Sequence, residues 1–195
     1  MVSTNTRYIA KIGMLSAIAV ILMFFEVPLP MMPVFLKLDA SELPAIIGAF
    51  AFGPMAGVTI EFVKNLLHAV NTQTMGIGEI ANFLVGVAFV LPAGYLYQHY
   101  RSRKGAVIAL VVGTFSMMFL ASLMNYFILL PVYQAVLHFP LDQIIQMGTV
   151  ANPQIVDLKS FIALGIAPFN MIKGIIMSLL TLMIYRKLFN VLCER

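Results

Sequence analysis

Charged and amide side chains interrupt some of the most apolar stretches of this 195-residue chain. Four of them follow i, i+3, i+4, i+7 spacing: Glu61, Lys64, Asn65 and His68. On a helix this spacing makes one polar stripe. A charged side chain at bilayer depth costs roughly 2.5–3.5 kcal/mol and usually marks a site for a substrate or an ion. The stripe could therefore bind a polar ligand, or Glu61 and His68 could act as acid and base in a small intramembrane enzyme.

A second polar pair, Asn170 and Lys173, lies one helical turn apart just after Pro168. Pro168 has no backbone donor, so it can leave the Leu164 carbonyl without its helical partner, which a membrane tolerates only where protein or water covers it. No acid lies at helical spacing from Lys173 in its own stretch. This pair therefore indicates a polar site more than a local ion pair.

Signatures of catalysis and of metal binding are missing from the sequence. It has no H-E-x-x-H, no G-x-S-x-G, no phosphate-binding G-x-x-x-x-G-K-S/T and no His/Cys cluster at metal spacing. Cys193 is the only cysteine, so no internal disulfide can form. We expect a protein that is not an enzyme and has no metal site or cofactor, and any ATP hydrolysis would need another chain.

The composition is that of an integral membrane protein. Hydrophobic residues make up 61% and charged residues 10%, and the mean hydropathy is +0.96, whereas soluble domains carry about 25% charged residues. The net charge of +4 does not indicate nucleic-acid binding, because most basic residues lie at the ends of apolar stretches, where they set membrane orientation. We expect one membrane domain, residues 1–195, in contact with lipid.

Six apolar stretches are expected to be helical: Tyr8–Phe25, Leu43–Phe52, Met55–Val70, Ile80–Tyr97, Ala106–Leu130 and Phe161–Tyr185. The second has only half of the ~20 residues that a spanning helix needs, so it could be the first half of a kinked helix that continues to Val70. Gly53 is a good helix stop and Pro54 a good helix start, which favours two helices. Six spans also place the basic clusters of both termini and of residues 101–104 on one side. The predicted fold is all-α, with six transmembrane helices and both termini cytoplasmic.

The two long outer connections, residues 26–42 and 131–158, are candidates for a lid over a site. The first contains Pro28, Pro30 and Pro33, which resist helix formation. The second contains two short helix-like pieces, and for it an interfacial cap without a gating role is an equal alternative. Connecting segments commonly carry function.

Polar residues from four spans would converge in the outer half of the membrane under this topology. They are Glu61, Lys64, Asn65, His68, Glu79, Asn82, Asn125, Asn170 and Lys173. The pattern predicts a pocket that opens to the outside. As the alternative, Glu61 and Lys64 could neutralise each other, and Asn82 and Asn125 could hold helices together.

The first helix carries small residues four positions apart, Gly13 and Ala17. Such a pair lets another helix approach closely, either from a partner protein or from within the same bundle.

The longest motifs resemble those of one family of vitamin importers. They are the segments 35–45 (FLKLDASELPA), 50–57 (FAFGPMAG), 61–68 (EFVKNLLH), 76–83 (GIGEIANF) and 169–174 (FNMIKG). Together they resemble the riboflavin-specific S-components of energy-coupling factor (ECF) vitamin transporters. The resemblance implies a high-affinity riboflavin-binding subunit of a prokaryotic cell-membrane importer, which works with a transmembrane coupling subunit and two ATPases. An S-component for another vitamin is the alternative, and phosphorylated flavin (FMN) is left open as a second ligand.

The resemblance also implies roles for residues. It makes the first outer loop a gate that includes Lys37 and Asp39, and it puts the coupling subunit against Gly13 and Ala17. The expected ligand-binding residues are Asn125, Asn170, Lys173, Asn65, Lys64 and Glu61. Asn and Lys suit the pyrimidine edge of riboflavin, and the polar stripe at residues 61–65 suits its ribityl hydroxyls. With no Trp in the chain, stacking on the flavin ring falls to Phe, Tyr or aliphatic side chains.

Overall fold

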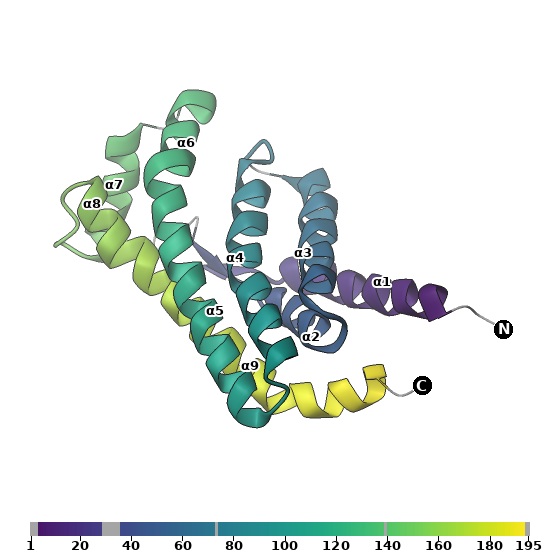
Figure 1. Ribbon diagram of the computed structural model, residues 1–195. Coiled ribbons are helices and arrows are strands. Elements are labelled where there is room, and N and C mark those ends of the chain that lie inside the picture. The colour runs from purple at the N-terminus through teal and green to yellow at the C-terminus, as the bar shows by residue number, and fades with distance from the viewer. Residues whose placement is uncertain (1–3, 29–35, 73, 139, 194–195) are drawn as a thin grey trace.

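The computed structural model describes residues 4–28, 36–72, 74–138 and 140–193. These residues form a helical bundle with one short antiparallel strand pair (Figure 1). In chain order the elements are α1 (Thr4–Met23), β1 (Val27–Pro28), β2 (Lys37–Leu38), α2 (Glu42–Phe52), α3 (Pro54–His68), η1 (Ala69–Asn71), α4 (Ile77–His99), α5 (Arg103–Met124), η2 (Asn125–Leu129), α6 (Leu130–Leu137), α7 (Leu141–Ala151), α8 (Leu158–Phe161), η3 (Ile162–Ile166) and α9 (Ala167–Cys193).

The break between the second and third apolar stretches lies at the predicted position. Gly53 has a φ of 103°, which a residue with a side chain rarely adopts, and it ends α2. Pro54 then begins α3, where its missing N–H costs no helical hydrogen bond. The alternative of one kinked helix that continues to Val70 is therefore wrong, and α2 and α3 are separate elements.

The fifth helix differs from the prediction, because it does not end at Leu130. A π-helical turn, η2, joins α5 to α6, and the helix continues to Leu137. A second π-helical turn, η3, joins α8 to α9. In both cases a proline follows two residues after the turn, Pro131 and Pro168. A π-turn changes the hydrogen-bond partners locally, so the helix passes a residue that lacks a donor without ending.

The short helix α2 lies at the centre of the bundle and contacts α1, α3, α4 and α9. Phe50 of α2 stacks on Tyr97 of α4, with ring centroids 4.0 Å apart. Gly57 of α3 has no room for a side chain, because Val90 of α4 and Ala49 of α2 occupy that space. Close packing of small and aromatic residues thus fixes α2, α3 and α4 relative to one another.

The chain is an all-α membrane protein by its architecture. Among the described residues, four helical stretches are long and apolar enough to cross a membrane: Thr6–Met23, Ile77–His99, Arg103–Val136 and Leu158–Tyr185. The helix α2 is apolar but short, with 11 residues. In Figure 1 the α3–α4 connection lies at the same end of the bundle as α6, α7 and α8, and the α4–α5 connection lies at the other end.

The first long connection contains the strand pair, in which Val27 pairs with Leu38 and Pro28 pairs with Lys37. Residues 29–35, with Pro30 and Pro33, lie outside the described part of the chain. The strand pair holds together the two ends of this connection, which joins α1 to α2.

Candidate ligand-binding site

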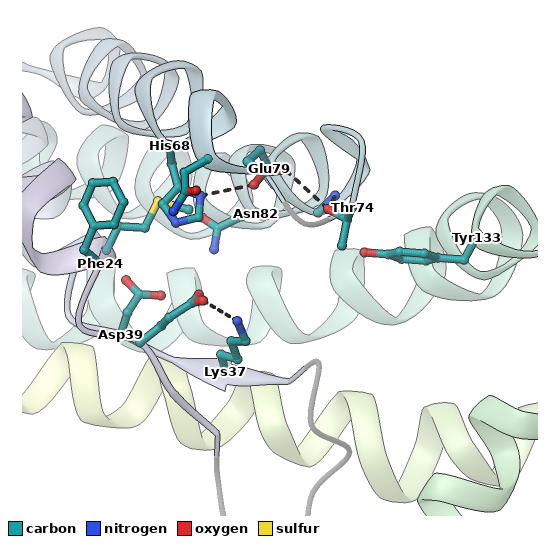
Figure 2. Close-up of a pocket in the computed structure, with 12 residues that line it drawn as sticks. Phe24, Lys37, Asp39, His68, Thr74, Glu79, Asn82 and Tyr133 are labelled. Carbon is teal, nitrogen blue, oxygen red and sulfur yellow. Dashed lines mark hydrogen bonds and ion pairs between the residues drawn. The ribbon is translucent and has the colours of Figure 1, made fainter. Parts of the chain in front are cut away.

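A cavity of about 510 Å³ lies between the strand pair and the facing ends of α1, α3, α4 and α6. Its lining residues are Met23, Phe24, Glu26, Lys37, Asp39, His68, Asn71, Thr74, Gly78, Glu79, Asn82 and Tyr133. Figure 2 shows His68, Glu79 and Thr74 on one wall, with Lys37 and Asp39 opposite them. The lining is rich in groups that donate and accept hydrogen bonds, as expected for a polar ligand or the polar part of a ligand.

A second, smaller cavity of about 140 Å³ adjoins the first. Its lining residues are Leu36, Lys37, Gly78, Ala81, Asn82, Val85, Asn125, Leu129, Leu130, Tyr133, Phe169, Asn170 and Lys173. Four residues line both cavities: Lys37, Gly78, Asn82 and Tyr133. The two cavities are therefore neighbours: the smaller one is more apolar and carries two amides and an ammonium group, and the larger one is more polar.

A buried ion cluster lies next to the smaller cavity and joins the first connection to α9. The Lys173 ammonium group lies 2.7 Å from Glu42 Oε1 and 3.3 Å from Asp39 Oδ2. Asp39 and Glu42 come from the end of that connection and the start of α2, which are 134 and 131 positions before Lys173. The acid partner that Lys173 lacks in its own helix is therefore supplied by tertiary contact.

The same cluster extends into α3 through Lys64. Its ammonium group lies 3.0 Å from Glu61 Oε2 and 3.3 Å from Glu42 Oε1, and it donates to Ser41 Oγ at 2.7 Å. Both Glu61 and Lys64 are fully buried. Gly86 of α4 packs directly against the Glu61 carboxyl group, so a side chain there would overlap it. Glu42 is the shared partner that links the two lysines.

Asp39 is the member of this cluster that precedes α2. Burial by itself would raise the pKa of its carboxyl group, but Lys173 and Lys64 outweigh burial, with help from Ser41, and lower the pKa from 3.8 to about 2. The backbone N–H of Ser41 donates to Asp39 Oδ1 at 2.8 Å. Asp39 is therefore a fixed anion at the root of the first connection.

On the opposite wall, Glu79 organises the α3–α4 connection. Its Oε1 lies 3.1 Å from His68 Nδ1, and its Oε2 accepts from Thr72 Oγ1 at 2.8 Å and from Thr74 Oγ1 at 3.4 Å. The Thr72 and Thr74 hydroxyls in turn accept from backbone N–H groups of Gly76 and Gly78. One carboxylate thus holds the end of α3 against the start of α4.

Three of the predicted ligand-binding residues line the smaller cavity: Asn125, Asn170 and Lys173. The two asparagines come from η2 and from the first turn of α9, and each donates its amide to the carbonyl four residues earlier. Each amide oxygen is thereby left to act as an acceptor. The two π-helical turns explain why both asparagines can line one space, because each turn changes the angular position of the residues beside it.

The other three predicted ligand-binding residues, Glu61, Lys64 and Asn65, line neither cavity. They lie behind the cavities, with Glu61 and Lys64 paired and Asn65 donating to the Glu61 carbonyl at 2.8 Å. The Lys64 ammonium group turns toward Ser41 and Glu42, and contact of this stripe with the ribityl chain stays a prediction. The ion-pair alternative for Glu61 and Lys64 describes their geometry.

The predicted lid residues Lys37 and Asp39 line the larger cavity, and Lys37 also pairs with Glu26 across the strand pair. Gly13 and Ala17 are exposed on α1, and a side chain at Gly13 would meet nothing within 4 Å. Neither of them packs inside the bundle, which removes that alternative for their small size.

The sequence analysis placed Asn82 among the polar residues of the predicted pocket but not among the ligand-binding residues, and it did not name Tyr133; both line both cavities. The Asn82 amide oxygen is buried without a hydrogen-bond partner among the described residues. Such an acceptor is costly unless a ligand or water satisfies it. The position of Asn82 at the start of an apolar span is the sequence feature that indicates its role. Tyr133 was not identified, because the helix was expected to end at Leu130.

A membrane bundle with a partly enclosed, polar-lined cavity is the architecture expected of a membrane-embedded binding protein. The sequence matches the family of the ECF transporter substrate-specific component over residues 7–185. The chain therefore belongs to the family of substrate-specific components of ECF transporters. Membership of a transporter family confirms that it is a multi-pass membrane transport protein and not an enzyme.

Named relatives narrow the comparison. The chain is 40% identical to the riboflavin transporter RibU of Staphylococcus aureus (strain TCH60), over 96% of this chain and 93% of that protein. It is 38% identical to the riboflavin transporter FmnP of Bacillus subtilis (strain 168), over 94% and 93%. A solved structure of the S component of a bacterial ECF transporter matches with a TM-score of 0.77 at 37% identity, and covers 98% of this chain and 100% of that one. The resemblance inferred from the motifs is confirmed.

Proposed function

We propose that this chain binds riboflavin in the adjoining cavities and is the riboflavin-specific component of an ECF transporter. The observation that carries the proposal is the convergence of Asn125, Asn170 and Lys173 on the smaller of two adjoining cavities. Relatives that are 38–40% identical over nearly the whole chain are riboflavin transporters by name, which supports the same ligand here.

The smaller cavity suits the pyrimidine edge of the flavin. That edge presents an acceptor, a donor and an acceptor, which asparagine amides and a lysine can match. The Lys173 ammonium group has three N–H donors, and its two carboxylate partners leave one for a ligand carbonyl. Phe169, Leu129 and Leu130 supply apolar contact for the flat ring. A ligand that failed to pair these polar groups would lose about 1–3 kcal/mol for each one left unsatisfied.

The larger cavity takes the ribityl chain in this proposal. Its hydroxyl groups can both donate and accept, and the lining offers carboxylates, amides and hydroxyls. In this proposal the stripe with Glu61, Lys64 and Asn65 does not need to contact the ribityl chain. Lys64 pairs with Glu42, and Glu42 pairs with Lys173, so the stripe helps to hold the Lys173 ammonium group in place. Lys37 and Asp39 belong to the connection at residues 26–42, which acts as the lid over the bound vitamin.

The proposed topology has six membrane segments, with α2 and α3 as two short ones between the longer helices. Both termini lie in the cytoplasm of a prokaryotic cell, because the basic residues at 101–104 and near both ends then share that side. The adjoining cavities lie at the opposite end of the bundle from the α4–α5 connection, so they open to the outside.

The proposed partners are a transmembrane coupling subunit and two cytoplasmic ATPases. On α1, the small and exposed residues Gly13 and Ala17 allow a partner helix to pack closely.

Calorimetry on the purified protein in detergent tests the ligand. Riboflavin is expected to bind one to one, with the same flavin recovered afterwards, whereas thiamine and biotin give no heat of binding. Binding of thiamine or biotin without flavin would make this a component for another vitamin. Chemical conversion of the flavin would contradict a transport role.

A further inference from the structure

The larger cavity carries one carboxylate that forms no ion pair with a lysine or arginine among the described residues. Three carboxylates line it: Glu26, Asp39 and Glu79. Glu26 pairs with Lys37, and Asp39 pairs with Lys173. Within the described residues, the ion-pair partner of Glu79 is the imidazole of His68, which adds no charge in its neutral form. The polar end of the cavity therefore keeps an uncompensated anion.

Glu79 is also held so that it cannot turn away. His68, Thr72 and Thr74 fix both carboxylate oxygens, and the side chain is 8% exposed. Glu79 lies in the first turn of α4, where the helix dipole stabilises a negative charge. Figure 2 shows its carboxylate between His68 and Thr74 at the wall that faces Asp39.

We propose that Glu79 is a specificity residue that makes the site prefer riboflavin to its 5′-phosphate by electrostatic repulsion. This inference rests on the proposed function, with the pyrimidine edge of the flavin in the smaller cavity. The ribityl chain then turns into the larger cavity past Asn82 and Tyr133, which line both. Its terminal hydroxyl can donate to a carboxylate, whereas a phosphate monoester carries about two negative charges and has acceptors only. The cavity is partly enclosed by protein, which weakens solvent screening, so the repulsion is larger than it would be at an open surface.

The ligand series separates charge from size. Riboflavin, riboflavin 5′-phosphate and the uncharged 5′-acetate ester of riboflavin are titrated at pH 8, with quenching of flavin fluorescence as the readout. The wild-type protein is expected to bind riboflavin and the acetate ester at least about tenfold more tightly than the phosphate. A tenfold ratio corresponds to about 1.4 kcal/mol. If the acetate ester is rejected as strongly as the phosphate, size is the cause and the inference is wrong.

The variant Glu79→Gln tests the residue. It is expected to narrow the ratio of phosphate to riboflavin dissociation constants by about tenfold, because it removes the charge and keeps the shape. Asp142→Asn is the matched control, since it removes one exposed acidic charge of α7 that lines neither cavity, and its ratio should equal that of the wild type. An unchanged ratio in Glu79→Gln would overturn the inference. If Glu79→Gln does not fold, the ligand series on the wild type still tests the inference, because equal binding of riboflavin and its phosphate would overturn it.

The two proposals fail in different ways. A wild-type protein that binds neither riboflavin nor its esters contradicts the proposed function itself. A wild-type protein that binds riboflavin and its phosphate equally well keeps the proposed function and overturns only the role of Glu79.

Discussion

At the scale of single residues, the Lys173 ammonium group belongs both to the proposed ligand site and to the buried ion cluster. It lines the smaller cavity and at the same time lies between Asp39 and Glu42. A buried charge is stable only when it is paired and hydrogen-bonded, so the cluster that surrounds Lys173 fixes where its remaining donor can lie. The neighbouring Asn170 lies one turn earlier on the same side of α9.

Changing Asn170 or Lys173 to Ala should each weaken riboflavin binding by about 1–3 kcal/mol, because a polar group of the flavin then stays unpaired. This corresponds to a loss of about 5- to 150-fold in affinity, measured by fluorescence titration. The two effects should not add, because the residues share one cavity. Variants that fold and bind riboflavin at full strength would show that the ligand lies elsewhere.

The pair of Glu61 and Lys64 gives a second prediction. Lys64→Ala should weaken binding, because it removes the buried counter-charge of Glu61 and leaves Glu42 with Lys173 as its remaining partner, which disturbs Lys173. The double variant Glu61→Gln, Lys64→Met removes both charges and should restore much of the affinity in the same titration. A double variant that stays as weak as Lys64→Ala would mean that Lys64 contacts the ligand directly.

Asp39 gives a prediction with a pH dependence. Its pKa of about 2 in the folded protein lies below the ordinary value of 3.8, so its ion pairs stabilise the folded state above about pH 4. That stabilisation, on the order of 2 kcal/mol, is lost as the pH falls from 4 toward 2. Thermal unfolding in detergent should show Asp39→Asn less stable than the wild type at pH 7, with the difference disappearing near pH 2. A difference that does not change with pH would exclude this role.

At the scale of elements, α1 has a buried face and an exposed side on which small residues lie among larger apolar ones. Leu15 and Ala19 pack into the core, whereas Gly13 and Ala17 are exposed. Gly13→Leu or Ala17→Leu should therefore fold and bind riboflavin normally, but should abolish ATP-dependent uptake in cells that contain the coupling subunit and ATPases. The readout is labelled riboflavin uptake beside binding to the purified protein. Normal uptake by both variants would place the coupling surface elsewhere.

Sequence patterns predicted most elements but not the course of the helices past their prolines. Gly53 and Pro54 act locally, through one backbone angle and one missing donor, so the break between α2 and α3 could be predicted. Pro131 was expected to end a helix in the same way. The outcome there depends on a π-helical turn and on packing of Leu130 against Ile144 and Phe161, which come from later in the chain.

Tertiary contacts likewise decided which polar residues reach the cavities. Asn125, Asn170 and Lys173 could be predicted from spacing and from the family motifs, and the structure brings them together. The partners of Lys64 and Lys173 could not, because Glu42 and Asp39 are more than 20 residues away from either lysine in the sequence. A helical wheel shows which residues share a face, but not which distant loop covers that face.

At the scale of the whole molecule, the long helices form a frame and the short elements carry the site. The long spans present apolar side chains outward, such as Phe115, Phe119 and Ile108 of α5, as lipid contact requires. The cavities lie where the ends of α1, α3, α4 and α6 meet the strand pair. The ion pair of Asp39 with Lys173 joins the first connection, which lines the larger cavity, to α9.

Riboflavin absorbs blue light, so the visible absorption spectrum of the purified protein tests the central proposal most directly. Protein purified from cells grown with riboflavin should be yellow, with close to one flavin per chain, and the extracted flavin should be unmodified riboflavin. A colourless protein that is correctly folded and gains no flavin absorbance after incubation with riboflavin would contradict the proposal that the adjoining cavities are a riboflavin site.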